Sequence, residues 1–208
     1  MEVREKILQD AEDLFVRYGV RSVTMDDVAR EVSMSKKTLY QYFDNKDKLV
    51  SEVALSHLEK EKKEFEEIAD ISQDAIHEIF LVTMCLRKHV FKMNPSLLYD
   101  MQKYHAEAWG HYLEFKNTTV RGNIERNISR GIDEGYFRSE IDPRVLSILR
   151  VEQVQLAFNT KIFPQDEFDF AGVQLQILNH FIHGLLTEVG REKYKEHLQS
   201  ETLNHSLK

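Results

Sequence analysis

The chain has 208 residues, of which 42% are hydrophobic, and its formal net charge is −7. This length allows one large domain or a small domain joined to a larger one. The acidic balance excludes a general polyanion-binding surface, so any contact with nucleic acid needs a local basic patch. The single cysteine, Cys85, excludes an intrachain disulfide and a cysteine-based metal cluster, and we expect it to be a buried, unreactive thiol.

Three short helices are predicted at the start of the chain. Apolar residues recur at helical spacing over residues 3–18, and Gly19 is suited to cap that helix. Thr24 and Asp27 have the spacing of a capping box and predict the start of a second helix. Ser35 is a good N-cap for a third helix. Because only three or four residues separate the second and third helices, the pattern is typical of a helix-turn-helix.

The next helices are also indicated by apolar spacing and capping residues. Asn45 ends the third helix and begins a fourth, and a fifth is predicted over residues 76–90. The pairs Asn94-Pro95 and Asp142-Pro143 each read as an N-cap followed by proline at the first helical position. Gly135 is expected to cap the helix before the second of these pairs.

The last part of the chain completes an all-α pattern. Gly110 and residues 116–119 are predicted break points between helices. Further helices are predicted over residues 146–158 and 173–189, the last ending at Gly190, and the polar tail from Gln199 is expected to fray. The sequence therefore predicts an all-α protein of about nine helices.

Residues 35–48, SKKTLYQYFDNKDK, concentrate positive charge in this acidic chain, with four lysines against two aspartates. On a helical wheel Leu39 and Phe43 point together into a small core. The outward face carries Lys37 and Gln41, with Thr38 nearby and with Tyr40 and Tyr42 at its edges. A major groove accepts one α-helix, and lysine and glutamine side chains can bond to base edges there.

Phosphate contacts are indicated around this helix. Thr24 and Ser35 lie at helix N-termini, where free backbone N–H groups favour a phosphate, and Lys36 is next to Ser35. Lys46 and Lys48 open the fourth helix and could hold the DNA backbone. A solvated helix with surface tyrosines would explain any one of these residues alone, but it explains the whole set less well.

The segment VRSVTMDDVAREVSMSKKTLYQYFDNKDKLVSEV resembles the DNA-binding segment of the TetR family of bacterial transcriptional regulators. The matching positions are Gly19, Thr24, Val28-Ala29, Ser35, Leu39-Tyr40, Tyr42-Phe43, Lys46 and Leu49. Residues 127–143, NISRGIDEGYFRSEIDP, resemble a stretch of the family's larger domain. Lys37 departs from the family pattern and Gln41 is less usual in it. The resemblance implies that DNA is contacted by Thr24, Ser35, Thr38, Tyr40, Tyr42 and Lys46, and also by Lys36 and Lys37.

The resemblance also implies two domains and a homodimer. Residues 1–48 would form the helix-turn-helix DNA-binding domain, and residues 49–208 a helical regulatory and dimerisation domain. The wide apolar stripe of the last predicted helix agrees, because such a helix needs more than one packing partner. The predicted dimer-interface residues are Leu175, Leu178, Ile182, Leu185 and Val189. A core within one chain is the alternative.

A small-molecule cavity is expected in the larger domain by the same resemblance. Its candidate lining residues are Tyr99, Met101, His105, Trp109 and Tyr112. A closed aromatic core is the alternative for these side chains. Arg87 and Arg150 are candidate buried cations that could pair with an anionic ligand. The nine histidines show no spacing typical of a metal site, so no metal or cofactor is expected.

These patterns together predict a dimeric regulator that binds palindromic double-stranded DNA. We expect a repressor that a small-molecule effector releases from its operator, with no enzymatic activity. No apolar stretch reaches the ~18–20 residues of a membrane span, and the charged N-terminus lacks the apolar centre of a signal peptide, so a cytoplasmic protein is expected. A helical small-molecule-binding protein or enzyme without a DNA role is the alternative. The sequence does not indicate the effector or operator, nor does it separate repression from activation.

Overall fold

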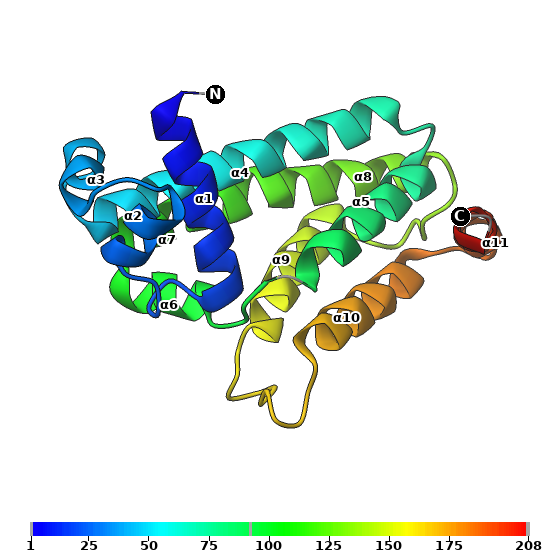
Figure 1. The fold of residues 1–208 in the computed structure, drawn as a ribbon. Coiled ribbons are helices and arrows are strands. Elements are labelled where there is room, and N and C mark those ends of the chain that lie inside the picture. The colour runs from blue at the N-terminus through cyan, green and yellow to red at the C-terminus, as the bar shows by residue number, and fades with distance from the viewer. Residues whose placement is uncertain (1, 92, 207–208) are drawn as a thin grey trace.

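The computed structural model describes residues 2–91 and 93–206, with side chains as far as residue 200. Eleven α-helices and one π-helical segment make up the regular structure of these ranges, which confirms the all-α prediction (Figure 1). The first four helices are α1 Val3–Tyr18, α2 Met25–Glu31, α3 Lys36–Tyr42 and α4 Lys46–Ile71. The others are α5 Ala75–Val90, α6 Leu97–Tyr104, α7 Ala106–Phe115, the π-helical η1 Lys116–Val120, α8 Arg121–Asp133, α9 Pro143–Ala157, α10 Phe170–Leu185 and α11 Glu188–Ser206.

The first four helices begin and end where their capping residues predict. Gly19 ends α1 with a φ of 81°, a backbone conformation that suits glycine. The hydroxyl of Thr24 accepts a hydrogen bond from the Asp27 N–H at the start of α2. The Ser35 hydroxyl caps α3 in the same way, and Asn45 caps α4. Local sequence therefore determines this part of the fold.

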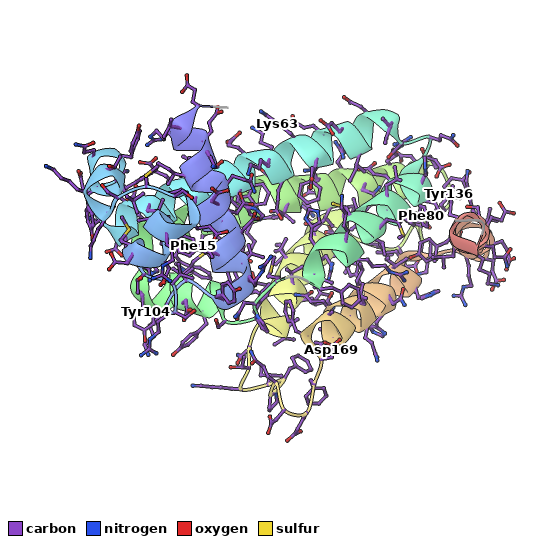
Figure 2. All side chains as sticks on the ribbon, viewed as in Figure 1. Phe15, Lys63, Phe80, Tyr104, Tyr136 and Asp169 are labelled. Carbon is purple, nitrogen blue, oxygen red and sulfur yellow. The ribbon has the colours of Figure 1, made fainter. Side chains whose placement is uncertain are left out.

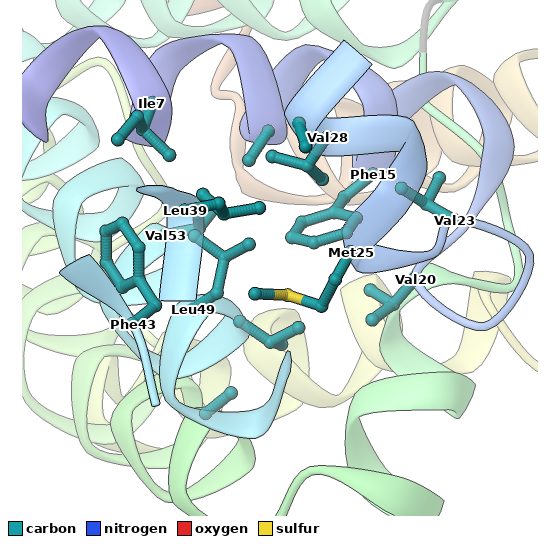
Figure 3. Close-up of a cluster of buried hydrophobic side chains, with 14 of the residues drawn as sticks. Ile7, Phe15, Val20, Val23, Met25, Val28, Leu39, Phe43, Leu49 and Val53 are labelled. Carbon is teal, nitrogen blue, oxygen red and sulfur yellow. The ribbon is translucent and has the colours of Figure 1, made fainter. Parts of the chain in front are cut away.

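A continuous apolar core holds the first helices together (Figure 3). Phe15 of α1, Val28 of α2 and Leu39 of α3 are all buried in it. The first turns of α4 add Leu49 and Val53, so the predicted domain boundary at residue 48 falls inside a helix that serves both domains. The same core includes Leu98, Met101 and Ala108 of α6 and α7, which joins the helix-turn-helix to the larger domain.

Three predicted helix boundaries in the middle of the chain, at Asn94, at Gly110 and at residues 116–119, are wrong. Asn94 does not cap a helix, because its N–H donates to the carbonyl of Val16 at 2.8 Å and its side chain accepts from the Ser96 N–H. Helix α6 begins two residues after the proline instead. Gly110 lies inside α7, and the break falls at His105, while η1 connects α7 to α8 without interruption.

The end of α10 was also predicted wrongly. The chain leaves the helix at Leu186, which forms an isolated bridge with Phe137. Thr187 then donates its N–H to the carbonyl of Tyr136 at 2.9 Å. The turn after α8 therefore binds the segment that the apolar pattern had assigned to one long helix. Gly190 is therefore inside α11, whose backbone remains helical beyond Gln199, where fraying was expected. The predicted caps at Gly135 and Asp142 are confirmed.

The close approach at Gly190 leads to a stability prediction. A Cβ at this position would lie 2.2 Å from the backbone carbonyl oxygen of Tyr136. Gly190→Ala is expected to lower the free energy of unfolding by about 1–3 kcal/mol, since backbone must move to relieve the clash. Gly110→Ala is the matched control, because a Cβ there meets nothing within 4 Å. It should stabilise the helix by roughly 0.5–1 kcal/mol. Urea denaturation of both variants checks the prediction, which equal stabilities would contradict.

The arrangement of the helices separates the two ends of the molecule. Helices α2 and α3 lie at one end and α11 at the other, with α4 running between them (Figure 1). Figure 2 places Tyr104 near the first end, and Phe80 and Tyr136 near the second. A second apolar core fills that far end, where α10 packs against α5 and Tyr194 of α11 is buried.

Candidate nucleic-acid interface and internal cavity

Helix α3 presents the predicted outward face to solvent. Leu39 is fully buried beneath it, and Phe43 is buried just after its last turn. The exposed side chains of the short helix are Lys36, Lys37, Tyr40, Gln41 and Tyr42, while Thr38 is half-buried. The two tyrosines remain 41% and 39% exposed, respectively, although large aromatic side chains usually seek burial. This face therefore has the shape and chemistry of a helix that enters a major groove.

The polar residues around α3 differ in whether their side chains already have hydrogen-bond or ion-pair partners within the protein. The Ser35 hydroxyl lies 2.7 Å from the Thr38 hydroxyl, and the Thr24 hydroxyl donates to Asp27 at 2.6 Å. Both are therefore occupied as caps, although both residues are exposed at helix N-termini. The Nζ of Lys36 lies 2.8 Å from an oxygen of Asp26, and this hydrogen bond raises the pKa of the lysine.

Lys37 and Lys46 are the lysines best placed for a ligand outside the protein. Lys37 is exposed and has no ion pair among the described side chains. Lys46, in the first turn of α4, is half-buried, and burial lowers the pKa of its amine despite the opposing effect of Asp100, Asp47 and Asp27. A partly desolvated lysine gains more from a phosphate than a fully hydrated one does.

A cavity of about 300 Å³ lies between the helix-turn-helix domain, formed by α1–α3, and the larger domain. The helix-turn-helix domain is called the reading head below. Its wall is mostly apolar and includes Phe15 and Val16 of α1, Val53 of α4, Tyr112 of α7 and Phe181 of α10. A molecule in this cavity would contact the helix-turn-helix domain and the larger domain at once. Small-molecule sites of this size and apolar character are common in proteins.

Some of the residues predicted to line the cavity do so, and others lie elsewhere in the structure. Tyr112 and Met101 line the cavity. Tyr99 is half-exposed and accepts a hydrogen bond from Lys103, so its prediction is wrong. His105 is buried away from the cavity, with its Nδ1 2.8 Å from a carboxylate oxygen of Asp47. It connects α4 to the junction of α6 and α7.

Trp109 is a further correction. It stacks on Tyr112 at a ring distance of 5.1 Å and stands behind it, outside the cavity wall.

Arg150 is a buried cation in the wall of this cavity. It was predicted as a candidate together with Arg87, but only Arg150 lines the wall. The side chain is buried, its Nη1 has no hydrogen-bond partner among the described residues, and its guanidinium lies over the Phe181 ring at 5.8 Å. Burial lowers the pKa of Arg150 to about 10.

Three possible metal ligands also meet at the cavity wall. The ligand atoms of Glu64, Cys85 and His89 lie within 4.8 Å of one another, and cysteine, histidine and carboxylate are ligands of Zn²⁺. Sequence reasoning considered the histidines alone and missed this group. The four-residue spacing of Cys85 and His89 was the available signal, but Glu64 comes from another helix. Cys85 is half-buried, not buried as predicted. Its partial burial raises the pKa of the thiol to about 11, which agrees with the expected low reactivity.

Comparison with known proteins now decides the family. Residues 7–53, which contain α2, α3 and their caps, match the family model described as bacterial regulatory proteins, tetR family. The chain belongs to the TetR family. It is 23% identical over 142 residues to the HTH-type transcriptional repressor KstR2 of Mycobacterium tuberculosis H37Rv, an alignment covering 67% of this chain and 71% of KstR2.

Solved structures of low sequence identity share the TetR-family fold. E. coli NemR in its reduced form aligns with a TM-score of 0.72 and 14% identity over 89% of this chain and 98% of NemR. SmeT in a complex with triclosan aligns with a TM-score of 0.65 and 16% identity over 89% of this chain and 92% of SmeT. With the family match and its repressor relatives, the exposed face of α3 makes this TetR-family protein a DNA-binding transcriptional regulator. Across the described ranges, no helix has the length and apolar character needed to cross a membrane.

The predicted dimer interface of this TetR-family chain needs correction. Leu178, Ile182 and Leu185 are buried inside the chain itself, because α5 and the segments after α8 and α10 cover that side of α10. Leu175 lines the cavity, whereas Val189 is exposed on α11. None of the three buried leucine and isoleucine side chains offers free surface to a second chain.

The exposed apolar stripe lies on the neighbouring helix α9. Its members are Val145, Ile148, Leu149 and Leu156, which are at helical spacing and between 40% and 58% exposed. The adjacent outer face of α10 carries the exposed residues Gln176, Asn179, His180, His183 and Gly184. Together we call these residues the α9–α10 face.

An ion-pair cluster connects the reading head of the TetR-family protein to α4. The Nδ1 of His57 lies 2.7 Å from a carboxylate oxygen of Glu12 on α1, and its Nε2 lies 3.4 Å from Glu61. Burial alone would lower the pKa of His57, but hydrogen bonds to the two carboxylates outweigh burial and raise it to about 10. Lys60 also contacts Glu12, at 2.7 Å.

The raised pKa of His57 predicts a pH-dependent stability. In the unfolded chain this histidine loses its proton near pH 6.5, whereas in the folded protein it keeps the proton to about pH 10. Its contribution is therefore complete below pH 6.5 and declines as pH rises towards 10, by at most about 1.4 kcal/mol per pH unit. His57→Gln should remove this decline. Thermal unfolding at pH 7, 8 and 9 measures it, and parallel curves for the two proteins would contradict the assignment.

Proposed function

We propose that this regulator binds palindromic double-stranded DNA as a homodimer and represses transcription until a small-molecule effector enters the internal cavity. The observation that carries the proposal is the junction of the two domains. The helix that supports the reading head, α1, provides part of the wall of a cavity whose other walls belong to the regulatory domain. Occupation of the cavity therefore has a direct physical route to the DNA-binding surface.

DNA contact is assigned to the exposed face of α3 and to the residues around it. Lys37 and Gln41 would meet base edges, with Tyr40 and Tyr42 against the backbone or a thymine methyl group. Around them, Thr24, Ser35, Lys36, Thr38 and Lys46 would hold phosphates. The exposure of α3 and its position at the end of the molecule support this assignment.

Dimerisation is assigned to the α9–α10 face. An apolar stripe on an exposed helix is stabilised when a second copy covers it, and the small residue Gly184 on α10 permits close approach. A two-fold pair presents two α3 helices to DNA, and half-sites one helical turn apart require about 34–36 Å between them. A palindromic operator follows from that symmetry.

Release follows from a difference in effector affinity between two arrangements of the arms. An effector that binds the non-binding arrangement more tightly by about 2–3 kcal/mol weakens operator affinity by roughly 30- to 150-fold. Helix α4, which runs from the reading head along the cavity, would transmit the change. The repressor KstR2 among the relatives and the triclosan complex of SmeT support a role in ligand-controlled repression, in the bacterial cytoplasm and without catalysis.

The test is a titration of the protein against DNA flanking its own gene, followed by fluorescence anisotropy and footprinting. The expected result is a symmetric footprint and an affinity that falls steeply as salt rises, because phosphate contacts release counterions. Light scattering on the same sample should give twice the mass of one chain, which is 24.5 kDa. Absence of DNA binding at low salt would instead favour a helical small-molecule-binding protein without a DNA role.

A further inference from the structure

We propose that the effector is an amphiphilic carboxylate, whose charged group pairs with Arg150 and whose apolar body fills the cavity. This inference rests on the proposed function, in which a ligand of the cavity controls release from DNA. It names the chemical class of that ligand from the wall of the cavity alone.

Arg150 is a buried arginine whose guanidinium is incompletely hydrogen-bonded by the described residues. Its side chain is only 5% exposed, and its Nη1 is buried with no hydrogen-bond partner in the part of the chain that the structure describes. The contact with the Phe181 ring, at 5.8 Å, cannot replace a hydrogen-bond acceptor. An uncompensated buried charge costs several kcal/mol, so it persists where something outside the folded chain completes it.

Apart from Arg150, the arginine and lysine side chains of the described wall already have partners. Arg126 contacts Glu78 at 2.6 Å, and Lys116 contacts Glu152 at 2.7 Å. His57 lies between two glutamates, as described above. Among the arginines and lysines of the described wall, Arg150 is therefore the one left for a ligand, and its planar guanidinium matches a carboxylate through two parallel hydrogen bonds.

The remainder of the ligand would meet an apolar wall. The wall near Arg150 includes Val151 and Val154 of α9 and Leu178 and Phe181 of α10, all apolar. A volume of about 300 Å³ is at the small end of the range for ligand sites. This space favours an apolar body of moderate length, and it disfavours a ligand that carries several charges along its length.

The position of Arg150 also explains how such a ligand would act. The residue belongs to α9, whose outer surface carries part of the proposed α9–α10 face, and the wall of the same cavity also includes Phe15 of α1. A carboxylate held at Arg150 would extend its apolar body towards the reading head. The ligand would thereby connect the proposed dimerisation helix with the helix that supports α3.

The experiment compares matched ligands on the full chain. Octanoate, decanoate, dodecanoate and 4-phenylbutanoate are each tested with the corresponding neutral amide and primary amine, by thermal unfolding and by isothermal titration. At least one carboxylate is expected to bind the wild-type protein at least about 10-fold more tightly than its amide, the factor expected for a charge-assisted hydrogen bond. Arg150→Met should abolish that preference, and Arg150→Lys should keep part of it. Arg87→Met, which alters an arginine outside the cavity wall, should leave it unchanged.

A second measurement does not depend on the choice of ligand. If Arg150 awaits an anion, Arg150→Met should leave the folding equilibrium constant of the ligand-free protein unchanged or raise it, by up to about 100-fold, because an unpaired buried charge is removed. A fall of more than about 10-fold would show a structural role and overturn the inference. Equal binding of carboxylates and amides, or no shift with any carboxylate, would overturn it as well.

The design separates this inference from the proposed function. Operator binding by the ligand-free wild-type protein tests the proposed function and is measured first. If operator binding is present and carboxylates have no preference over amides, the inference fails while the proposed function stands. If carboxylates bind through Arg150 but no DNA is bound, the proposed function fails. The combined expected result is dissociation of the operator complex by the carboxylate that binds wild-type protein most tightly.

Discussion

Replacing Tyr42 and Lys46 together by alanine is expected to weaken operator binding by at least about 100-fold. Both side chains border the exposed face of α3, and a two-fold dimer loses each of them twice. Hydrogen bonds to charged groups contribute roughly 1.5–3 kcal/mol each, so two lost phosphate contacts from Lys46 alone exceed that factor. The slope of log affinity against log salt should also fall by about two, because two phosphates are no longer neutralised.

The matched control for this variant alters the same residue types elsewhere. Tyr99→Ala with Lys195→Ala removes an exposed tyrosine from α6, outside the exposed face of α3, and an exposed lysine from α11. Helix α11 lies at the far end of the molecule from α3 (Figure 1). Its affinity and salt slope should match those of the wild-type protein. Fluorescence anisotropy at several salt concentrations measures both quantities, with circular dichroism to verify helical content. Retained affinity in Tyr42→Ala with Lys46→Ala would refute the assignment of the contacts.

Replacing Ile148 and Leu149 together by glutamate is expected to produce monomers and to lower operator affinity by roughly 100- to 10,000-fold. The two side chains are 45% and 46% exposed in the single chain, so carboxylates there stay hydrated in the monomer. A two-fold interface would bury four added charges without partners, which disfavours association. DNA binding then loses the gain of two linked half-sites, which is commonly of that size.

Light scattering and anisotropy distinguish the outcomes of this second variant. The expected mass is that of one chain, with weak binding to a half-site that is still dependent on salt. Ile162→Glu is the control, because Ile162 is exposed to a similar extent but lies after the end of α9 and outside the stripe. A dimeric Ile148→Glu, Leu149→Glu protein would exclude the α9–α10 face as the interface and would direct attention to Val189 on α11.

The cavity and the dimer surface show why apolar periodicity alone is ambiguous. Leu178, Ile182 and Leu185 form a stripe that the sequence presents as suitable for a partner chain. In the folded protein that stripe packs against helices of the same chain, and the free stripe is on α9. Periodicity indicates that one side of a helix is buried, but it does not indicate which helix or chain covers it. Trp109 and His105 were misplaced for the same reason.

The sequence by itself determined the structure of the helix-turn-helix domain. Local interactions over three or four residues can be read directly from the sequence. They include the caps at Thr24, Ser35 and Asn45 and the helical periodicity that places Leu39 and Lys37 on different sides of α3. Only the tertiary structure decided the sites built from distant segments. Three such features depend on contacts between residues far apart in sequence. They are the unpaired Nη1 of Arg150, the proximity of Glu64 to Cys85, and the hydrogen bond between the segment after α10 and the turn after α8. Those contacts follow from how whole helices pack, for which local spacing carries no information.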